Sequence, residues 1–160
     1  MMAELQHVSG LKELQAAMKA LPTNISRNVL RGAVNAGATV IREEAKARAP
    51  VYAGPPIKGQ APPGTLKRSL YQKQIREKSS ALLQTFFVGV RRGRSAKKTK
   101  KGTLDAWYAH FVEFGTSKMA ARPFMRPAFE AKKSAAVQAI ERYLQKRIPE
   151  EVDKLRGRQR

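Results

Sequence analysis

Apolar residues recur at three- and four-residue spacings near the start of the chain, which predicts two amphipathic helices. Ser9 can cap the first helix, which is expected over residues 9–21 and is ended by Pro22. The second and longer helix is expected over residues 24–48, before Pro50. Small residues within it would let a sheet or a neighbouring subunit approach closely, although tight packing inside the core explains them more simply.

Strand-forming side chains are concentrated in residues 82–90, where they alternate in the manner of a half-buried strand. A preceding strand would carry Leu70, Tyr71 and Ile75. Residues 78–81 are polar enough to form the turn between the two strands. The pattern therefore predicts an antiparallel hairpin in the middle of the chain.

A compact aromatic helix is expected over residues 105–114, with Asp105 as its cap. Gly115 stands where the end of a helix requires a residue with positive φ. A closing helix is expected over residues 127–148, with Pro127 in the first turn, where a missing N–H costs little. The second half of the chain is therefore expected to be helix, sharp turn, irregular link and helix.

Three stretches are expected to lie outside the packed core. Residues 50–65 contain five prolines and three glycines, which predicts a loop that is flexible in the free subunit. Composition leaves open whether this loop is a disordered linker or an arm ordered by a neighbour. The basic loop 91–103 should stay extended and solvated, and Pro149 should end the closing helix and leave a frayed tail over residues 149–160.

Together these elements predict an α+β fold, in which a small antiparallel sheet is packed by a long N-terminal helix and a C-terminal helix. A length of 160 residues with 42% hydrophobic residues fits a single structural domain over residues 1–160.

Charge adds an expectation about partners. The chain has 32 Lys+Arg against 12 Asp+Glu, a net charge of +20, which predicts attraction to DNA, RNA or an acidic protein surface. Contact with DNA or an acidic partner would come from the basic loop, whose cations are Arg91, Arg92, Arg94, Lys97, Lys98, Lys100 and Lys101. This loop has no interleaved aromatic side chains, so it indicates contact with the nucleic-acid backbone and not reading of bases.

Compartment and membrane patterns are also informative. The absence of cysteine excludes disulfides and cysteine-based metal sites. The first ten residues lack the basic and apolar pattern of a secretory signal, and no run approaches the roughly 20 apolar residues that span a bilayer. We therefore expect neither secretion nor membrane insertion.

Few residues in the chain indicate catalysis. The histidines are His7 and His110, and neither belongs to a cluster of acids with metal-ligand spacing. Phosphate-binding and dinucleotide-binding glycine motifs are missing. His110 and Glu113 could share a helix face, but such a pair is more often a structural hydrogen bond than a site. We therefore expect no catalytic, cofactor-binding or metal-binding residues.

Residues 108–129, YAHFVEFGTSKMAARPFMRPAF, resemble the signature of the phage tail-component family named after gene product ten of the lambdoid phage HK ninety-seven. We call them the signature segment. The flanking order of predicted elements agrees more loosely over most of the chain. The family motif corresponds here to Tyr108, Ala109, Glu113, Phe114, Gly115, Thr116, Pro123, Phe124, Pro127 and Ala128.

This resemblance implies a non-enzymatic structural virion protein of a tailed bacteriophage. It would act at the head–tail junction, or neck, or at the tail end as a tail-completion or tail-terminator protein. It would form a homomeric ring, with six-fold symmetry the first expectation, and would contact other neck or tail-tube proteins. It would be found in the virion after assembly in the host cytoplasm.

The resemblance also suggests residues that shape the subunit or its ring interface. They are Tyr108, Phe111, Glu113, Phe114, Gly115, Thr116, Arg122, Pro123, Phe124, Arg126 and Pro127. Glu113 is expected to form an ion pair with Arg122 or Arg126, within one subunit or between subunits, unless it is simply a solvated acid at a helix end.

Two other classes of protein remain as alternatives. A small basic nucleic-acid-binding protein would account for the net charge of +20 equally well. An enzyme such as a phage nuclease is less well supported, because no metal-ligating acids lie near a histidine.

Overall fold

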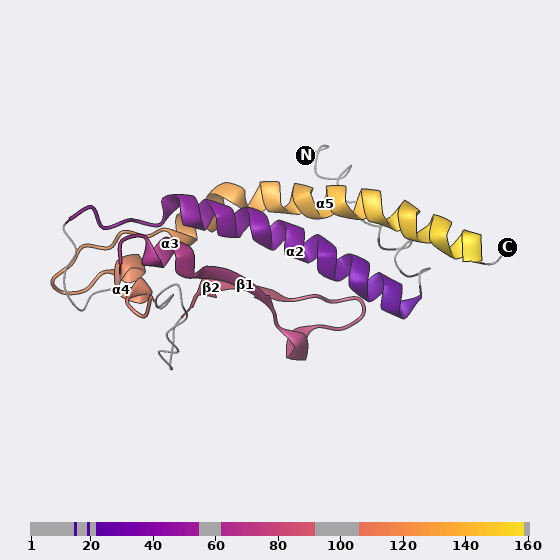
Figure 1. Cartoon of the computed structure of the whole chain (residues 1–160), viewed down its shortest axis with the longest axis horizontal. Helices are drawn as coiled ribbons and strands as arrows, with labels where there is room; N and C mark the ends of the chain where they lie inside the picture. Colours follow the sequence, from indigo (N-terminus) through magenta and orange to yellow (C-terminus); the bar gives the residue numbers. More distant parts are fainter. Residues whose placement is uncertain (1–14, 16–18, 20–21, 55–61, 92–105, 159–160) are drawn as a thin grey trace, which may run out of the picture. The chain divides into compact units, whose positions relative to one another are not determined.

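The computed structural model describes residues 15, 19, 22–54, 62–91 and 106–158 (Figure 1). Most of the helix predicted over residues 9–21 lies outside these residues. The same holds for the basic loop, of which Arg91 alone is described. In chain order the elements are α2 (Thr23–Arg48), α3 (Thr65–Ser69), β1 (Leu70–Gln74), η1 (Arg76–Lys78), β2 (Phe86–Val90), α4 (Ala109–Phe114) and α5 (Met125–Arg158). The predicted α+β class is confirmed.

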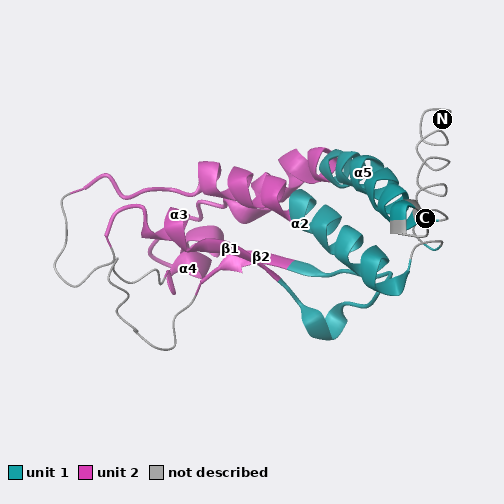
Figure 2. Ribbon diagram, turned by 45° about the vertical axis from the view of Figure 1, so that its right-hand side comes forward, with its two compact units in different colours: residues 1–37, 74–86, 137–160 teal, residues 38–73, 87–136 magenta. Residues whose placement is uncertain are grey.

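The chain divides into two compact units (Figure 2). Unit 1 comprises Met1–Gly37, Gln74–Phe86 and Val137–Arg160, and unit 2 comprises Ala38–Lys73 and Phe87–Ala136. Helices α2 and α5 are each divided between the two units, α2 after Gly37 and α5 after Ala136. The expectation of a single structural domain over residues 1–160 stays a prediction.

In unit 1, the N-terminal part of α2 packs against the C-terminal part of α5. The buried residues are Val29, Ala33, Leu144 and Ile148. Gly32 permits the close approach, because a Cβ atom there would overlap the ring and hydroxyl of Tyr143. At these positions the small residues of α2 serve packing within the core.

In unit 2, the core gathers the end of α2, the α3–β1 segment, α4 and the start of α5. Phe124 is its largest fully buried side chain and is 1% exposed. The other buried residues of this cluster are Ala45, Ala49, Leu66, Leu70, Ala106, Ala109 and Ala128. Because alanines dominate the cluster, the elements around Phe124 can pack closely together.

The predicted antiparallel hairpin is present as the two-stranded sheet β1–β2. Outside the strands, the bonds from Ile75 N–H to Thr85 O (2.9 Å) and from Arg91 N–H to Ser69 O (2.9 Å) keep the same register. The strand predicted over residues 82–90 begins later, at Phe86. The connection between the strands is a folded loop that starts with η1 and is held by side-chain bonds such as that from the Thr85 hydroxyl to Lys78 O (2.8 Å). It is therefore longer than the turn predicted over residues 78–81.

Helix α5 is longer than the predicted closing helix 127–148. It begins at Met125 and continues through Pro149 to Arg158, so the predicted end at Pro149 and the frayed tail 149–160 are wrong for the described residues. Val152 and Leu155 pack on the core of unit 1. Arg147 also pairs with Glu150 (2.6 Å) and Glu151 (2.9 Å) across the proline, which helps the helix to continue.

Two further differences concern short helices. The aromatic helix predicted over residues 105–114 is shorter, since α4 begins at Ala109 after a turn at residues 107–108, and Asp105 lies outside the described residues. Helix α3 was not predicted. It follows Gly64, which has φ 75°, and its first residue, Thr65, donates a hydroxyl hydrogen bond to Pro62 O (2.6 Å).

Candidate functional site

The signature segment begins with α4, which ends at Gly115. Gly115 has φ 76° and ψ −178°, a conformation essentially restricted to glycine. Its N–H donates to Phe111 O (2.8 Å). A Cβ atom at this position would lie 2.9 Å from both Ala121 N and Met119 O, which are backbone atoms. The predicted positive φ is confirmed, and the surrounding backbone also requires glycine.

After Gly115 the chain makes a tight reversal. Thr116 N–H donates to Met119 O (2.9 Å), and Met119 N–H donates to Thr116 O (3.3 Å). The Thr116 hydroxyl accepts a bond from Lys118 N–H (3.2 Å). Arg122 N–H then donates to Val112 O (2.8 Å), so the returning chain runs beside α4. This reversal brings the start of α5 to the side chain of Glu113.

Glu113 accepts hydrogen bonds from three consecutive backbone N–H groups. Phe124 N–H (2.8 Å) and Met125 N–H (3.0 Å) donate to Oε2, and Arg126 N–H (3.1 Å) donates to Oε1. These groups belong to the N-terminus of α5, where the first donors have no partner within the helix and the helix dipole favours an anion. Glu113 therefore caps α5 from a separate element, and we call this arrangement the Glu113 cap.

Pro127 completes the Glu113 cap. It has no N–H, and the next donor, Ala128 N–H, already bonds to Phe124 O within the helix (3.2 Å). Each backbone donor from Phe124 to Ala128 thus has an acceptor. The first-turn position expected for Pro127 is confirmed, although α5 starts two residues before it.

Glu113 as a whole residue is only 8% exposed. Burial alone would raise the pKa of Glu113, but the N–H bonds from Met125, Phe124 and Arg126, aided by the positive charge of Arg126, outweigh it and hold the pKa below its ordinary value. Within one subunit, the ion pair predicted with Arg122 or Arg126 is replaced by these backbone bonds: among the described residues, the ion pairs within 4.0 Å involve other acids. An ion pair between subunits stays a prediction.

The remaining predicted residues of the signature segment also lie in unit 2. Burial raises the pKa of Tyr108, which packs against the core, while Phe111 meets Trp107 edge to face at 5.9 Å between ring centroids. Pro123 is exposed and immediately precedes buried Phe124. His110 does not pair with Glu113, because its Nδ1 lies 2.9 Å from Trp107 O. The segment is therefore held together mainly by backbone bonds and ring packing.

Of the cations proposed for DNA or acidic-partner contact, Arg91 is described. Its guanidinium lies 5.7 Å above the Tyr71 ring. The other six, Arg92, Arg94, Lys97, Lys98, Lys100 and Lys101, lie outside the described residues.

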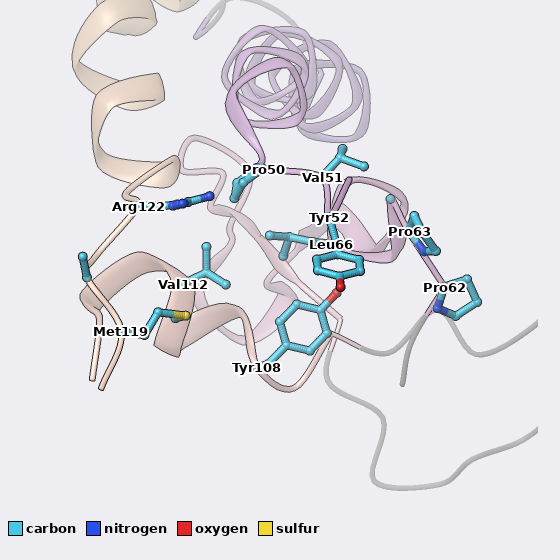
Figure 3. A pocket seen from close by; sticks show the side chains of 12 residues that line it. Pro50, Val51, Tyr52, Pro62, Pro63, Leu66, Tyr108, Val112, Met119 and Arg122 are labelled. Atoms are coloured by element: carbon cyan, nitrogen blue, oxygen red, sulfur yellow. The ribbon is translucent and has the colours of Figure 1, made fainter. Parts of the chain in front are cut away.

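An apolar hollow of about 440 Å³ lies beside the signature segment (Figure 3). Prolines and Tyr52 line it from the predicted loop, and Tyr108, Val112 and Met119 line it from the signature segment. Among the described residues that line it, Arg122 is the charged one and none is an acid or a histidine. This described part of the lining therefore offers shape and apolar contact but no acid–base pair.

In the described part of the chain, no three His, Cys, Asp or Glu side chains gather in a way that could hold a metal ion. In the same residues, no helix combines the length and the apolar character needed to cross a bilayer.

Comparison with known proteins identifies a matching family. A family model described as "Bacteriophage HK97-gp10, putative tail-component" matches residues 12–115, which is more than half of the chain. The matched region includes Glu113 and Gly115 but ends before the residues that Glu113 caps. No curated protein and no solved structure matches significantly.

Proposed function

The chain belongs to this HK97-gp10 family of bacteriophage tail components, and from that premise we propose a non-enzymatic structural role at the head–tail junction or tail end. Family membership carries the proposal and supports a place in the virion. Contact with other virion proteins is implied in the same way. The more specific step would be tail completion, tail termination or closure of the neck.

The Glu113 cap supports a structural role for the signature segment. Both carboxylate oxygens are occupied by backbone N–H groups, so this acid is committed to holding α5. A catalytic acid or base must instead reach a substrate proton. The signature segment is thus better suited to fixing the shape of a subunit than to carrying out a reaction.

The proposal includes a homomeric ring, for which the loop between β1 and β2 is a suitable contact. Its tip carries Leu82 and Leu83, which are 56% and 62% exposed. The loop is nevertheless well held: Ser80 N–H donates to Leu83 O (2.6 Å), and Thr85 N–H donates to Ser79 Oγ (3.1 Å). Burying one leucine contributes roughly 1.5–3 kcal/mol, so a preformed pair of leucines can contribute substantially to each subunit contact.

Ring assembly is expected in purified protein and should be favoured by salt. Subunits of net charge +20 repel one another, and added salt screens that repulsion while leaving apolar contacts in place. Analytical ultracentrifugation at about 0.1 M and 0.5 M salt, with negative-stain imaging, should show more rings at the higher concentration. Six-fold symmetry is the first expectation for their images.

The double variant Leu82→Ser, Leu83→Ser should shift this equilibrium strongly toward monomer without loss of helix content. Val137→Ser is the matched control, because Val137 is also an exposed apolar residue of unit 1 but lies on α5. Unchanged assembly of the double variant would exclude the loop as the contact. Monomeric wild-type protein at every salt concentration would contradict a self-assembling ring.

The net charge favours a second candidate, a small basic nucleic-acid-binding protein. That protein would bind duplex DNA as a monomer, and its affinity would fall steeply as salt rises. The two candidates thus respond oppositely: salt promotes the ring and weakens the DNA complex. Deleting residues 92–102 would show whether the basic loop retains DNA in the particle or joins heads to tails.

A further inference from the structure

Unit 2 contains a second hollow, which shares no lining residue with the proline-lined one. It has a volume of about 690 Å³ and lies among β2, α4 and the first turn of α5. We call it the Phe114 groove. Phe87, Val88, Phe114 and Arg126 are among the residues that line it. Glu113 also contributes to the lining, but its carboxylate is bound to the N-terminus of α5.

The groove exposes unusually large aromatic surfaces. Phe114 is 64% exposed and Phe87 is 48% exposed. Phe87 is steadied by Tyr71, whose ring meets it edge to face at 6.2 Å between centroids. Exposed aromatic side chains that gather at a hollow are characteristic of protein interaction sites.

Two arginines give the groove a positive rim. The Arg126 guanidinium lies 5.2 Å from the Phe114 ring centroid, and that of Arg91 lies 5.7 Å from the Tyr71 ring centroid. Stacking leaves the edges of a guanidinium available to carboxylates. Among the described residues no ion pair within 4.0 Å involves Arg126 or Arg91, although the Glu113 carboxylate, which is bound to the start of α5, interacts electrostatically with Arg126.

From this combination of rings and arginines we propose that the Phe114 groove binds an acidic segment of a different virion protein. The segment inserts an apolar or aromatic side chain between Phe87 and Phe114, and its carboxylates pair with Arg126 and Arg91. The inference deepens the proposed function, since it assumes partners within the virion, and it names their chemistry.

Charge also makes a second copy of this chain a poor occupant. Another copy brings a further net charge of +20. Most of its described acids are already paired with lysine or arginine on their own helices, namely Glu43, Glu44, Glu130, Glu150 and Glu151. An acidic segment of another protein is not repelled by the net positive charge and does not have to break existing ion pairs. Charge complementarity would also speed and orient its docking.

Single-stranded nucleic acid is the competing polyanion. Its binding sites stack successive bases along a basic track that follows the backbone. The Phe114 groove instead combines a short apolar hollow, which includes Val88 and Val90, with arginines at its rim. Aromatic residues and arginine at the centre of a contact are typical of protein interfaces.

The test measures binding of a fluorescent, end-blocked peptide to the full-length protein by anisotropy. The peptide has a central phenylalanine–leucine pair flanked on each side by three glutamates. We expect saturable binding, and Phe114→Ala and Arg126→Gln should each weaken it about tenfold or more. Both side chains are exposed, so circular dichroism should show unchanged helix content.

Control variants distinguish binding in the groove from nonspecific electrostatic or hydrophobic binding elsewhere on the protein. Phe129→Ala and Arg142→Gln remove an exposed phenylalanine and an exposed arginine of α5 that do not line the groove, and both should leave binding unchanged. A peptide with glutamine in place of every glutamate should bind at least about tenfold more weakly. Equal binding of the two peptides, or insensitivity to both groove variants, would overturn the proposal.

Two further measurements distinguish the alternatives. Tighter binding of a 12-nucleotide thymidine strand than of the acidic peptide, lost in Phe114→Ala, would assign the groove to nucleic acid and overturn the proposal. The Leu82→Ser, Leu83→Ser variant should bind the acidic peptide as well as wild type does. If the wild-type protein formed no rings but still bound the acidic peptide, the result would contradict the proposed ring and leave the proposed groove in place.

Discussion

Replacing Gly115 with alanine should destabilise the protein by about 3–5 kcal/mol, the largest effect expected from any single methyl group in the signature segment. At φ 76° and ψ −178° the backbone is in a region that side chains disfavour. The new Cβ would also lie 2.9 Å from two backbone atoms, Ala121 N and Met119 O, which cannot rotate away. Urea unfolding followed by circular dichroism measures the loss.

Gly157→Ala is the matched control for this variant. Gly157 lies in α5, and a Cβ there would meet no atom within 4 Å. Alanine is the better helix former by about 1 kcal/mol, so this variant should be as stable as wild type or slightly more stable. If Gly115→Ala were as well tolerated as Gly157→Ala, Gly115 would not have the positive φ and the close backbone contacts on which the prediction rests.

Glu113→Gln should destabilise the protein by about 2–4 kcal/mol at neutral pH. Glutamine has nearly the same shape, but it removes the negative charge from the start of α5. Its amide keeps one acceptor oxygen but puts an NH2 donor in place of the other, so at least one of the three N–H groups loses its acceptor. Glu77→Gln, a change of an exposed acid in η1, provides the control and should alter stability by less than about 0.5 kcal/mol.

The Glu113 cap should also make stability depend on pH in the acid range. The pKa of Glu113 is lowered in the folded protein, so the folded state binds its proton less readily than the unfolded state. The stabilisation is therefore complete above the ordinary pKa of 4.5 and is lost as pH falls through the lower, folded pKa. The difference in unfolding free energy between wild type and Glu113→Gln should shrink over that window. A constant difference would contradict the cap.

The main elements of the fold could be predicted from local pattern. Pro22 and Pro50 bracket α2, and alternating strand-forming residues mark β2. Gly115 was predicted to need positive φ because of its place after an apolar helix, and it has φ 76°. These features depend on neighbours in the sequence, so a single chain contains the information needed to find them.

The errors arose where distant contacts decide the structure. Pro149 was expected to end a helix, but Val152 and Leu155 pack on the core of unit 1 and carry α5 past it. Leu82 was placed in a strand, although side-chain bonds such as that from Ser79 Oγ–H to Ile75 O (2.6 Å) hold a folded loop there. Neither contact is visible in local periodicity.

The partner of Glu113 was missed for a related reason. Residue types suggested that an acid near arginines would form an ion pair, whereas its partners are backbone N–H groups 11 to 13 residues away. Those groups reach Glu113 only because the Gly115 turn and the bond from Arg122 N–H to Val112 O reverse the chain. The proline at position 127, just inside a helix with no acidic residue in its first turn, was the available indication that α5 needs an acceptor from elsewhere.

The account rests on the claim that the acid of the signature segment holds the start of α5. An NMR pH titration that follows the amide protons of Phe124, Met125 and Arg126 tests it most directly, because an amide proton bonded to a carboxylate shifts when that carboxylate is protonated. We predict that all three titrate together, at a pH below the ordinary pKa of glutamate, and that Glu113→Gln abolishes the transition. Amide protons that show no common transition, or one that persists in Glu113→Gln, would contradict the claim.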